Sequence, residues 1–252
     1  MKIVKKYTAL FCIILLFSTC NDKDVNNCIQ TTGAIISKEF LVDSFDKIIV
    51  NNGVELFIKE SSEQKIIVET GENLLSDIIL TVSDNQLEIT DNNDCNFFRD
   101  YGVTKVYIYV SNITRIRNSS TYPVNSIGVL NFDTLQLISE NYLSDYLNFG
   151  DFNLEVNSQT VNIIANGPSN HKIKGFSNKI NVNFAGNNPR FNGEDLLVKN
   201  AQLFARSTND ILIKASEKVS GNLYSTGDVI LLKKPTTIDL KAHFTGKVIN
   251  RY

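Results

Sequence analysis

Short runs of alternating apolar and polar residues dominate the chain from about residue 40 onward. Each run has the length of a strand, is rich in β-branched and aromatic residues, and is bounded by turn pairs such as Asn-Gly or Asp-Asn. Only "ENLLSDI" (72–78) suits a helical turn or two. The pattern therefore predicts an almost pure β chain. The clearest runs are "VELFIK" (54–59), "KIIVET" (65–70), "IILTVS" (78–83), "QLEITD" (86–91) and "KVYIYV" (105–110).

Small residues recur at intervals of about twenty in the second half of the chain. A period of this size fits one coil of a β-solenoid, in which coils stack about 4.8 Å apart and equivalent side chains lie above one another. Asparagines, of which the chain has 31, would line the turns and form amide ladders. A sandwich or antiparallel barrel would explain the strands but not the period. The recurring residues are Ser119, Ser139, Ala165, Ala185, Ala205 and Ser225, with one longer step after Ser139.

The first residues have the layout of a secretory signal peptide. A basic start is followed by an apolar stretch, Ala9 to Phe17, that is far shorter than the about 20 residues needed to span a bilayer. The tetrapeptide "FSTC" resembles a bacterial lipobox, which predicts cleavage before Cys20 and acylation of that cysteine. An ordinary secretory signal that happens to end in cysteine is the alternative. We therefore expect a signal peptide (1–19), a flexible tether (20–34) and one β domain (35–252).

Charge and cysteine content narrow the partners and the compartment. Removing residues 1–19 discards three lysines and no acids, so the balance of 25 bases and 27 acids becomes 22 and 27, a net charge of −5. No basic stripe is present, which argues against a nucleic-acid partner. Cys28 and Cys95 remain after Cys12 is removed and Cys20 is acylated. An oxidising compartment favours joining them, although two free thiols stay open as an alternative.

The leader is followed by the segments "FDKIIVNNGVELFIKE", "TVSDNQLEITD", "YSTGDV" and "TGKVIN". Together they resemble the GIN-type putative adhesin-head family of Bacteroidota lipoproteins. The resemblance covers about residues 40–252 and implies a right-handed parallel β-helix of the pectin-lyase kind. It also implies a cell-envelope address, as an outer-membrane lipoprotein that is periplasmic or surface-exposed. We expect the ends of such a stack to be covered by residues 91–102 and 243–252.

Motifs of catalysis and of cofactor binding are missing from the sequence. His171 and His243 stand alone, without the spacing of a zinc site, and His171 is expected in a surface turn. No GxSxG, GxGxxG or P-loop motif is present. We therefore predict no catalytic residues, no metal and no cofactor.

Two candidate binding features remain. Tyrosines concentrate between residues 100 and 150, where exposed rings could stack on sugars or anchor a protein partner. Asp210 and Asp228 fall on successive repeats and could line one face. The favoured prediction is a non-enzymatic envelope module that binds a surface glycan or protein; the alternative is a polysaccharide lyase or hydrolase using Asp210 and Asp228. The candidate tyrosines are Tyr101, Tyr122, Tyr142 and Tyr146.

Overall fold

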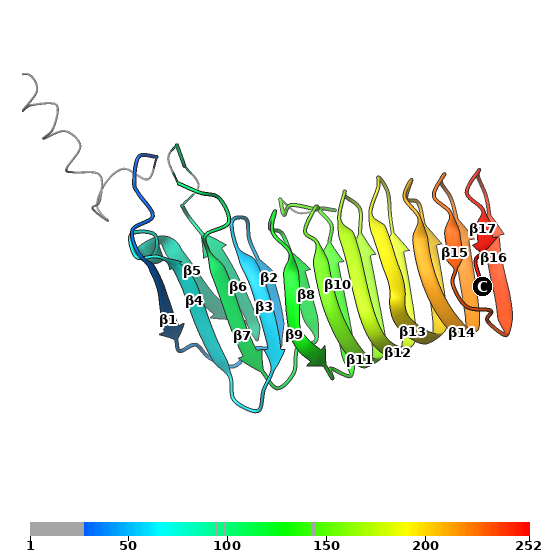
Figure 1. Cartoon of the computed structure of the whole chain (residues 1–252), viewed down its shortest axis with the longest axis horizontal. Coiled ribbons are helices and arrows are strands. Elements are labelled where there is room, and N and C mark those ends of the chain that lie inside the picture. The colour runs from blue at the N-terminus through cyan, green and yellow to red at the C-terminus, as the bar shows by residue number, and fades with distance from the viewer. Residues whose placement is uncertain (1–27, 94, 98, 143–144) are drawn as a thin grey trace, which may run out of the picture.

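The computed structural model describes residues 28–252, apart from residues 94, 98, 143 and 144. The predicted signal peptide (1–19), the predicted lipidation site Cys20 and the first part of the tether lie outside the described residues. The described strands join one mixed sheet of seventeen strands. In Figure 1 they form an elongated body with β1 near one end and β16 and β17 at the other.

The first half of the body, which we name the mixed region, contains both parallel and antiparallel pairs. Strands β1–β4, β4–β7 and β5–β6 pair antiparallel, whereas β2–β6 and β3–β7 pair parallel. Asp84 and Asn85 both have positive φ, at 51° and 59°, as the two-residue hairpin between β5 and β6 requires. The elements of the mixed region are β1 (Ile35–Phe40), β2 (Lys47–Val50), β3 (Glu55–Glu60), β4 (Lys65–Gly71), the 3₁₀ helix η1 (Leu75–Asp77), β5 (Ile78–Ser83), β6 (Gln86–Asp91) and β7 (Lys105–Val110).

The predicted right-handed parallel β-helix with uniform coils of about twenty residues is wrong. The fold is all-β, but the sheet is mixed and forms an open half-barrel. One cause is local: the tight hairpin at Asp84–Asn85 returns the chain beside β5, so β6 pairs with it antiparallel. The other antiparallel pairs, β1–β4 and β4–β7, join strands that lie far apart in the sequence.

In the second half of the body, which we name the parallel region, all pairs are parallel. Strands β8 and β9 pair with β2 and β3 on one side and with β10 and β11 on the other. The strands are β8 (Arg115–Asn118), β9 (Val124–Leu130), β10 (Thr134–Ser139), β11 (Phe152–Ala165), β12 (Asn170–Phe184), β13 (Arg190–Ala205), β14 (Ile211–Leu223), β15 (Val229–Leu231), β16 (Thr237–Ala242) and β17 (Val248–Asn250).

The register in the parallel region departs from a strict period of twenty. Ser139 lies opposite Ala165, as the longer step predicts, but Ala165 lies opposite Phe184, which in turn lies opposite Ala205. Ala165 and Ala205 are buried, whereas Ala185 is exposed. β-Bulges in β12–β13 and β13–β14 absorb the difference in step. In this row Ala165, Phe184, Ala205 and Leu223 follow one another, so the three alanines do not form one row.

A continuous apolar core runs through both regions. Because side chains alternate between the faces of a strand, alternate residues of β11 are buried, first from Phe152 to Ser158 and then from Val161 to Ala165, with the phase shifting at Gln159 and Thr160. His171, which was expected at the surface, is 1 % exposed and stacks between Phe152 and Phe184, with ring centroids 5.3 and 5.8 Å away. Burial lowers its pKa to about 3, so the ring is neutral in the folded protein. Ser169 Oγ lies 3.1 Å from its Nε2 atom.

Amide side chains bridge neighbouring strands along the outer face of the parallel region, at strand positions, whereas the sequence predicts amide ladders in the turns. Asn181 donates to Asn162 Oδ1 at 2.6 Å, and Asn153 donates to Asn125 Oδ1 at 3.2 Å. The C-terminal end of the body differs from the expectation. Residues 243–252 do not cover this end, because they supply β17 and leave β16 with one partner, β14, among the described strands.

Candidate functional site

Two neighbouring hollows lie where the mixed region meets the parallel region. The first is a cavity of about 210 Å³, and the second is a shallower hollow of about 690 Å³; both include Asn52, in the turn after β2. We name the two together the tyrosine edge. The first hollow is lined by residues that include Asn52, Asp91, Asn93, Arg99, Tyr101 and Tyr122, and the second by Asn51, Asn52, Ser119, Asp145, Tyr146 and Leu147.

The segment after β8 shapes one wall of both hollows. Asn118 is fully buried and donates to the carbonyls of Tyr122, at 3.0 Å, and Asp151, at 2.8 Å, while its Oδ1 atom accepts from Ser120 N. Ser120 Oγ donates to Val54 O at 2.8 Å and accepts from Tyr122 N at 3.1 Å. These hydrogen bonds fix both the N–H group and the carbonyl group of Tyr122. The wall is therefore preorganised before any ligand arrives.

Asp91, at the end of β6, fixes the floor of the first hollow. Its Oδ1 atom accepts from Asn93 N and Nδ2, at 2.8 and 2.7 Å, and its Oδ2 atom accepts from Thr104 Oγ1 at 2.7 Å. Thr104 Oγ1 also lies 3.0 Å from Thr70 Oγ1. The carboxylate therefore joins three segments of the mixed region around the hollow.

Arg99 and a disulfide hold the loop between β6 and β7. Cys28 and Cys95 are joined, with an S–S distance of 1.96 Å. Arg99 is 8 % exposed, and it donates to Cys95 O at 2.7 Å and to Gln30 O at 3.3 Å. Because Gln30 follows Cys28 closely, the guanidinium and the disulfide link the same two stretches of chain. Together they position Tyr101, which follows Arg99 by two residues.

Tyr101 and Tyr122 both line the first hollow. Tyr101 is 79 % exposed, whereas Tyr122 is half-buried. Burial raises the pKa of Tyr122, and Glu55 and Tyr101 add to the shift, so its hydroxyl stays protonated and can donate. Gly102 has φ +74°, and a Cβ there would come within 2.8 Å of Tyr122 Cε1, so only glycine lets the backbone approach the ring.

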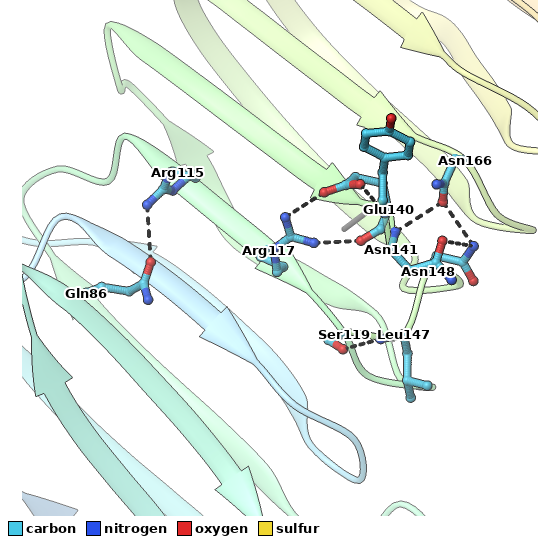
Figure 2. Close-up of polar contacts among 10 residues, drawn as sticks. Gln86, Arg115, Arg117, Ser119, Glu140, Asn141, Leu147, Asn148 and Asn166 are labelled. Carbon is cyan, nitrogen blue, oxygen red and sulfur yellow. Dashed lines mark hydrogen bonds and ion pairs between the residues drawn. The ribbon is translucent and has the colours of Figure 1, made fainter. Parts of the chain in front are cut away.

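Arg117 of β8 is not part of the lining of the second hollow, but it contacts Tyr146, which is. Its guanidinium donates to Glu140 Oε1 at 2.7 Å and to Glu140 O at 2.6 Å, as Figure 2 shows. The guanidinium also lies 4.8 Å from the centre of the Tyr146 ring, within the range of a cation–π contact. Ser119 Oγ accepts from Leu147 N at 2.6 Å (Figure 2). This bond ties the loop between β10 and β11 to the end of β8.

Tyr142 belongs to the same loop but not to the lining of either hollow. Its backbone N–H donates to Glu140 Oε2 at 2.6 Å, and it is 75 % exposed. The structure thus brings Tyr101, Tyr122 and Tyr146 around two neighbouring hollows and leaves Tyr142 beyond their lining.

Asp210 and Asp228 are not part of the tyrosine edge. Asp210 Oδ1 accepts from Asp228 N at 3.0 Å, and Asp228 Oδ1 accepts from Lys247 N at 2.7 Å. Asp151 Oδ1 accepts from Asn170 N in the same way, at 2.6 Å. These carboxylates satisfy backbone amides in successive turns of the parallel region, a structural use that the turn preference of aspartate predicts.

The chemistry of the tyrosine edge is that of recognition. Its lining offers aromatic faces, amide groups, the carboxylates of Asp91, Asp100 and Asp145, and the guanidinium of Arg99, which is already engaged with the protein. Such groups suit oriented hydrogen bonding and stacking. Among the described residues, no group of three or more His, Cys, Asp or Glu side chains is placed to hold a metal ion. Sequence reasoning identified the tyrosines but missed Asn52, Asp91 and Arg99. The turn signal "NNG" beside "VELFIK" was the one available pointer to Asn52.

Comparison with known proteins places the chain in a family. Residues 44–235 match the family described as "Putative auto-transporter adhesin, head GIN domain". The chain belongs to this GIN-domain family. The resemblance noted in the sequence is thereby confirmed, and membership of an adhesin family indicates a protein of the cell envelope or surface. Among curated proteins, none matches the sequence.

Solved structures share the fold of this GIN domain. A putative adhesin from Bacteroides fragilis superposes with a TM-score of 0.74 at 17% identity, covering 87% of this chain and 99% of its own. A putative adhesin from Parabacteroides merdae gives 0.63 at 14% identity, covering 88% and 98%. A putative lipid binding protein from Parabacteroides distasonis gives 0.63 at 14% identity, covering 88% and 99%. In the part of this chain that the structure describes, no helix is long and apolar enough to cross a membrane.

Proposed function

We propose that the protein is a non-enzymatic adhesin head of the cell envelope that binds a glycan through the tyrosine edge. The observation that carries the proposal is that Tyr101 and Tyr122 line the same hollow, one wall of which is held by hydrogen bonds of Asn118 and Ser120. Flat aromatic faces stack on the apolar faces of sugar rings, while amides and carboxylates bond to hydroxyls. Membership of the adhesin family supports the same reading.

A glycan fits the tyrosine edge better than a protein partner does. The first hollow is small, and it places the polar groups of Asn52, Asn93 and Asp91 around two tyrosines. Protein partners usually bury a larger patch with an apolar centre. Two neighbouring hollows of this kind suit consecutive sugar units of a short oligosaccharide.

Binding to an array of printed bacterial and host glycans tests the proposal. Tyr101→Ala should weaken binding to any glycan that the protein recognises by about tenfold or more, because a stacked aromatic anchor contributes on the order of 1.4 kcal/mol or more. Because Tyr101 is exposed, its replacement should leave the fold intact. Tyr224→Ala is the matched control, since Tyr224 is also exposed but lies in the parallel region. Equal losses in the two variants, or none in Tyr101→Ala, would contradict the proposal.

The alternative of a carbohydrate-active enzyme has less support. Asp210 and Asp228, the carboxylates considered for catalysis, each accept a hydrogen bond from a backbone amide of the next turn. A glycosidase needs two carboxyl groups flanking the scissile bond. Incubation with neutral and acidic polysaccharides should yield no new reducing ends or unsaturated products. Turnover that disappears in Asp210→Asn would favour the enzyme instead.

We also propose that the protein is anchored to the outer membrane through lipid on Cys20, facing either the periplasm or the outside. The support is the lipobox-like "FSTC" after a short apolar stretch. Two or more acyl chains give stable anchoring, since each buried methylene contributes about 0.8 kcal/mol. Cys20→Ser should release the protein from the membrane fraction. Retention of this variant would rule out the anchor, and protease treatment of intact cells would assign the side.

A further inference from the structure

The C-terminal end of the parallel region is an open sheet edge. Among the described strands, β16 pairs with β14 alone and β17 with β15 alone. Ile238 lies opposite Val219, and Leu240 lies opposite Gly221, so both continue the inward-facing row of β14. Val219 is fully buried, yet Ile238 is 43 % exposed. The difference arises because another strand follows β14 and none follows β16 (Figure 1).

The outer face of β16 carries one acid and one base at matched positions. Asp239 and Lys241 flank Leu240, and because side chains alternate they share the face opposite to Leu240. Both are exposed, and none of the ion pairs within the described chain involves either of them. An acid and a base two positions apart are self-complementary. When such a strand pairs antiparallel with its own copy, each acid faces the other chain's base.

We propose that this edge binds a second copy of the chain, β16 against β16, about a two-fold axis through Leu240. Asp239 then lies opposite Lys241 of the second copy, and the reciprocal pair forms on the other side of the axis. Ile238 lies opposite Ala242, so the inward-facing apolar row continues from one copy into the next. A two-fold contact of this kind closes on itself and gives a dimer. Unpaired backbone groups along the edge supply the hydrogen bonds.

The open edges at the other end of the body fit β16 less well. Strand β1 carries Lys38 and Glu39 at consecutive positions, which point to opposite faces and cannot match a pair on one face. Strand β5, "IILTVS", carries no charge. Pairing of β16 with either strand would also be heterologous and would build open chains of molecules. Charge complementarity therefore selects the second copy's β16 as the occupant.

The proposed dimer has a defined shape. Because β1 and β16 lie at opposite ends of the body (Figure 1), the two N-terminal ends point away from each other at the extremities. Two chains anchored through Cys20 would then meet head to head from two surfaces, a consequence that rests on the proposed anchor. The pairing itself does not depend on the anchor or on the tyrosine edge.

Sedimentation velocity of the purified chain carrying Cys20→Ser, over a wide concentration range, tests the pairing. We expect a monomer–dimer equilibrium. Asp239→Lys places two lysine pairs across the axis and should raise the dimer dissociation constant roughly tenfold or more. Lys241→Asp should do the same, and the double variant D239K/K241D should restore the affinity of the original chain.

The control is Glu194→Lys, which makes the same change of charge at an exposed position of β13 and should leave the dimer unchanged. Circular dichroism verifies that each variant keeps its strands. A chain that stays monomeric at every concentration, assemblies larger than a dimer, or a double variant no better than the single ones would each overturn the proposal. The dimer dissociation constant does not depend on glycan binding. The result for Tyr101→Ala therefore tests only the proposed function, and the sedimentation experiment tests only the dimer.

Discussion

The mixed and parallel regions use the same kind of core but are held together differently. In the mixed region, single links join stretches far apart in sequence, such as Cys28–Cys95, with a separation of 67 residues, and Arg99 with Gln30. In the parallel region, β11 to β14 are strands of 13 to 16 residues, and each is bonded along most of its length to its neighbours. Damage to one link should therefore loosen a whole part of the mixed region, whereas damage in the parallel region should stay between neighbouring strands.

The disulfide is the largest single link in the mixed region. Replacing both Cys28 and Cys95 with serine should lower the free energy of unfolding by about 4 kcal/mol, because the closed loop restricts the unfolded chain. Chemical denaturation with and without reductant measures the loss. Reductant should lower the stability of the original chain by the same amount and leave the double variant unchanged. Equal denaturation midpoints for the oxidised and reduced chains would show that the disulfide does not contribute to stability.

A close backbone approach in the parallel region should give the next largest effect. Gly221 has φ +138°, and a Cβ there would lie 1.9 Å from Leu203 O on the neighbouring strand. Gly221→Ala should therefore cost about 3 kcal/mol or more. Gly186→Ala is the control, since Gly186 has no positive φ and a Cβ there would meet no other part of the chain within 4 Å. A loss below about 1 kcal/mol at Gly221 would show that β13 and β14 can separate freely.

Lowering the pH should reduce the free energy of unfolding, because His171 is buried as a neutral ring in the parallel region. Its pKa is about 3 in the folded protein and 6.5 ordinarily, so below pH 6.5 the unfolded chain binds a proton that the folded chain does not. The contribution of neutral His171 to the free energy of unfolding is fully present above pH 6.5 and is lost as the pH falls toward about 3. By pH 5 the loss should reach about 2 kcal/mol. His171→Phe, which keeps an aromatic ring between Phe152 and Phe184, should remove this part of the loss, whereas His243→Phe should keep it. Urea unfolding at pH 7 and pH 5 measures both, and identical pH dependence in the two variants would contradict the assignment.

The amide ladders should contribute least. Asn181→Ala removes the hydrogen bond to Asn162 and should lower the free energy of unfolding by about 1 kcal/mol. Asn183→Ala, at an exposed position of the same strand, should change it by less than about 0.5 kcal/mol. Thermal unfolding followed by circular dichroism compares the two. A larger loss of stability for Asn183→Ala would mean that the hydrogen bond between Asn181 and Asn162 does not stabilise the fold.

The sequence predicted the strands well because alternation of apolar and polar residues is a local signal. It predicted the overall arrangement less well, because register depends on bulges that no composition reveals. Ala165, Ala185 and Ala205 stand at equal intervals, yet Ala185 is exposed, since β11 and β12 are offset by one residue fewer, with Ala165 opposite Phe184. The hairpin at Asp84–Asn85 needs positive φ at two non-glycine residues, and the other antiparallel pairs, β1–β4 and β4–β7, join distant strands, so neither is a local signal.

The candidate site was predicted in part for a similar reason. Exposed tyrosines near an irregular stretch are visible in composition, so Tyr101 and Tyr122 could be named in advance. Their partners could not be named, because Asn52 and Asp91 reach the site through pairing between distant strands. His171 was misplaced because a lone histidine beside turn residues looks exposed, whereas its neighbours in space are Phe152 and Phe184.

Hydrogen–deuterium exchange before and after reduction tests the difference between the two regions most directly. Exchange measured by mass spectrometry should rise on reduction in residues 28–34 and 71–104, the stretches that Cys28–Cys95 and Arg99 hold around the first hollow. It should stay unchanged in β11 to β14, where strands bond to neighbours on both sides. A uniform rise along the chain, or none near the hollow, would contradict the account.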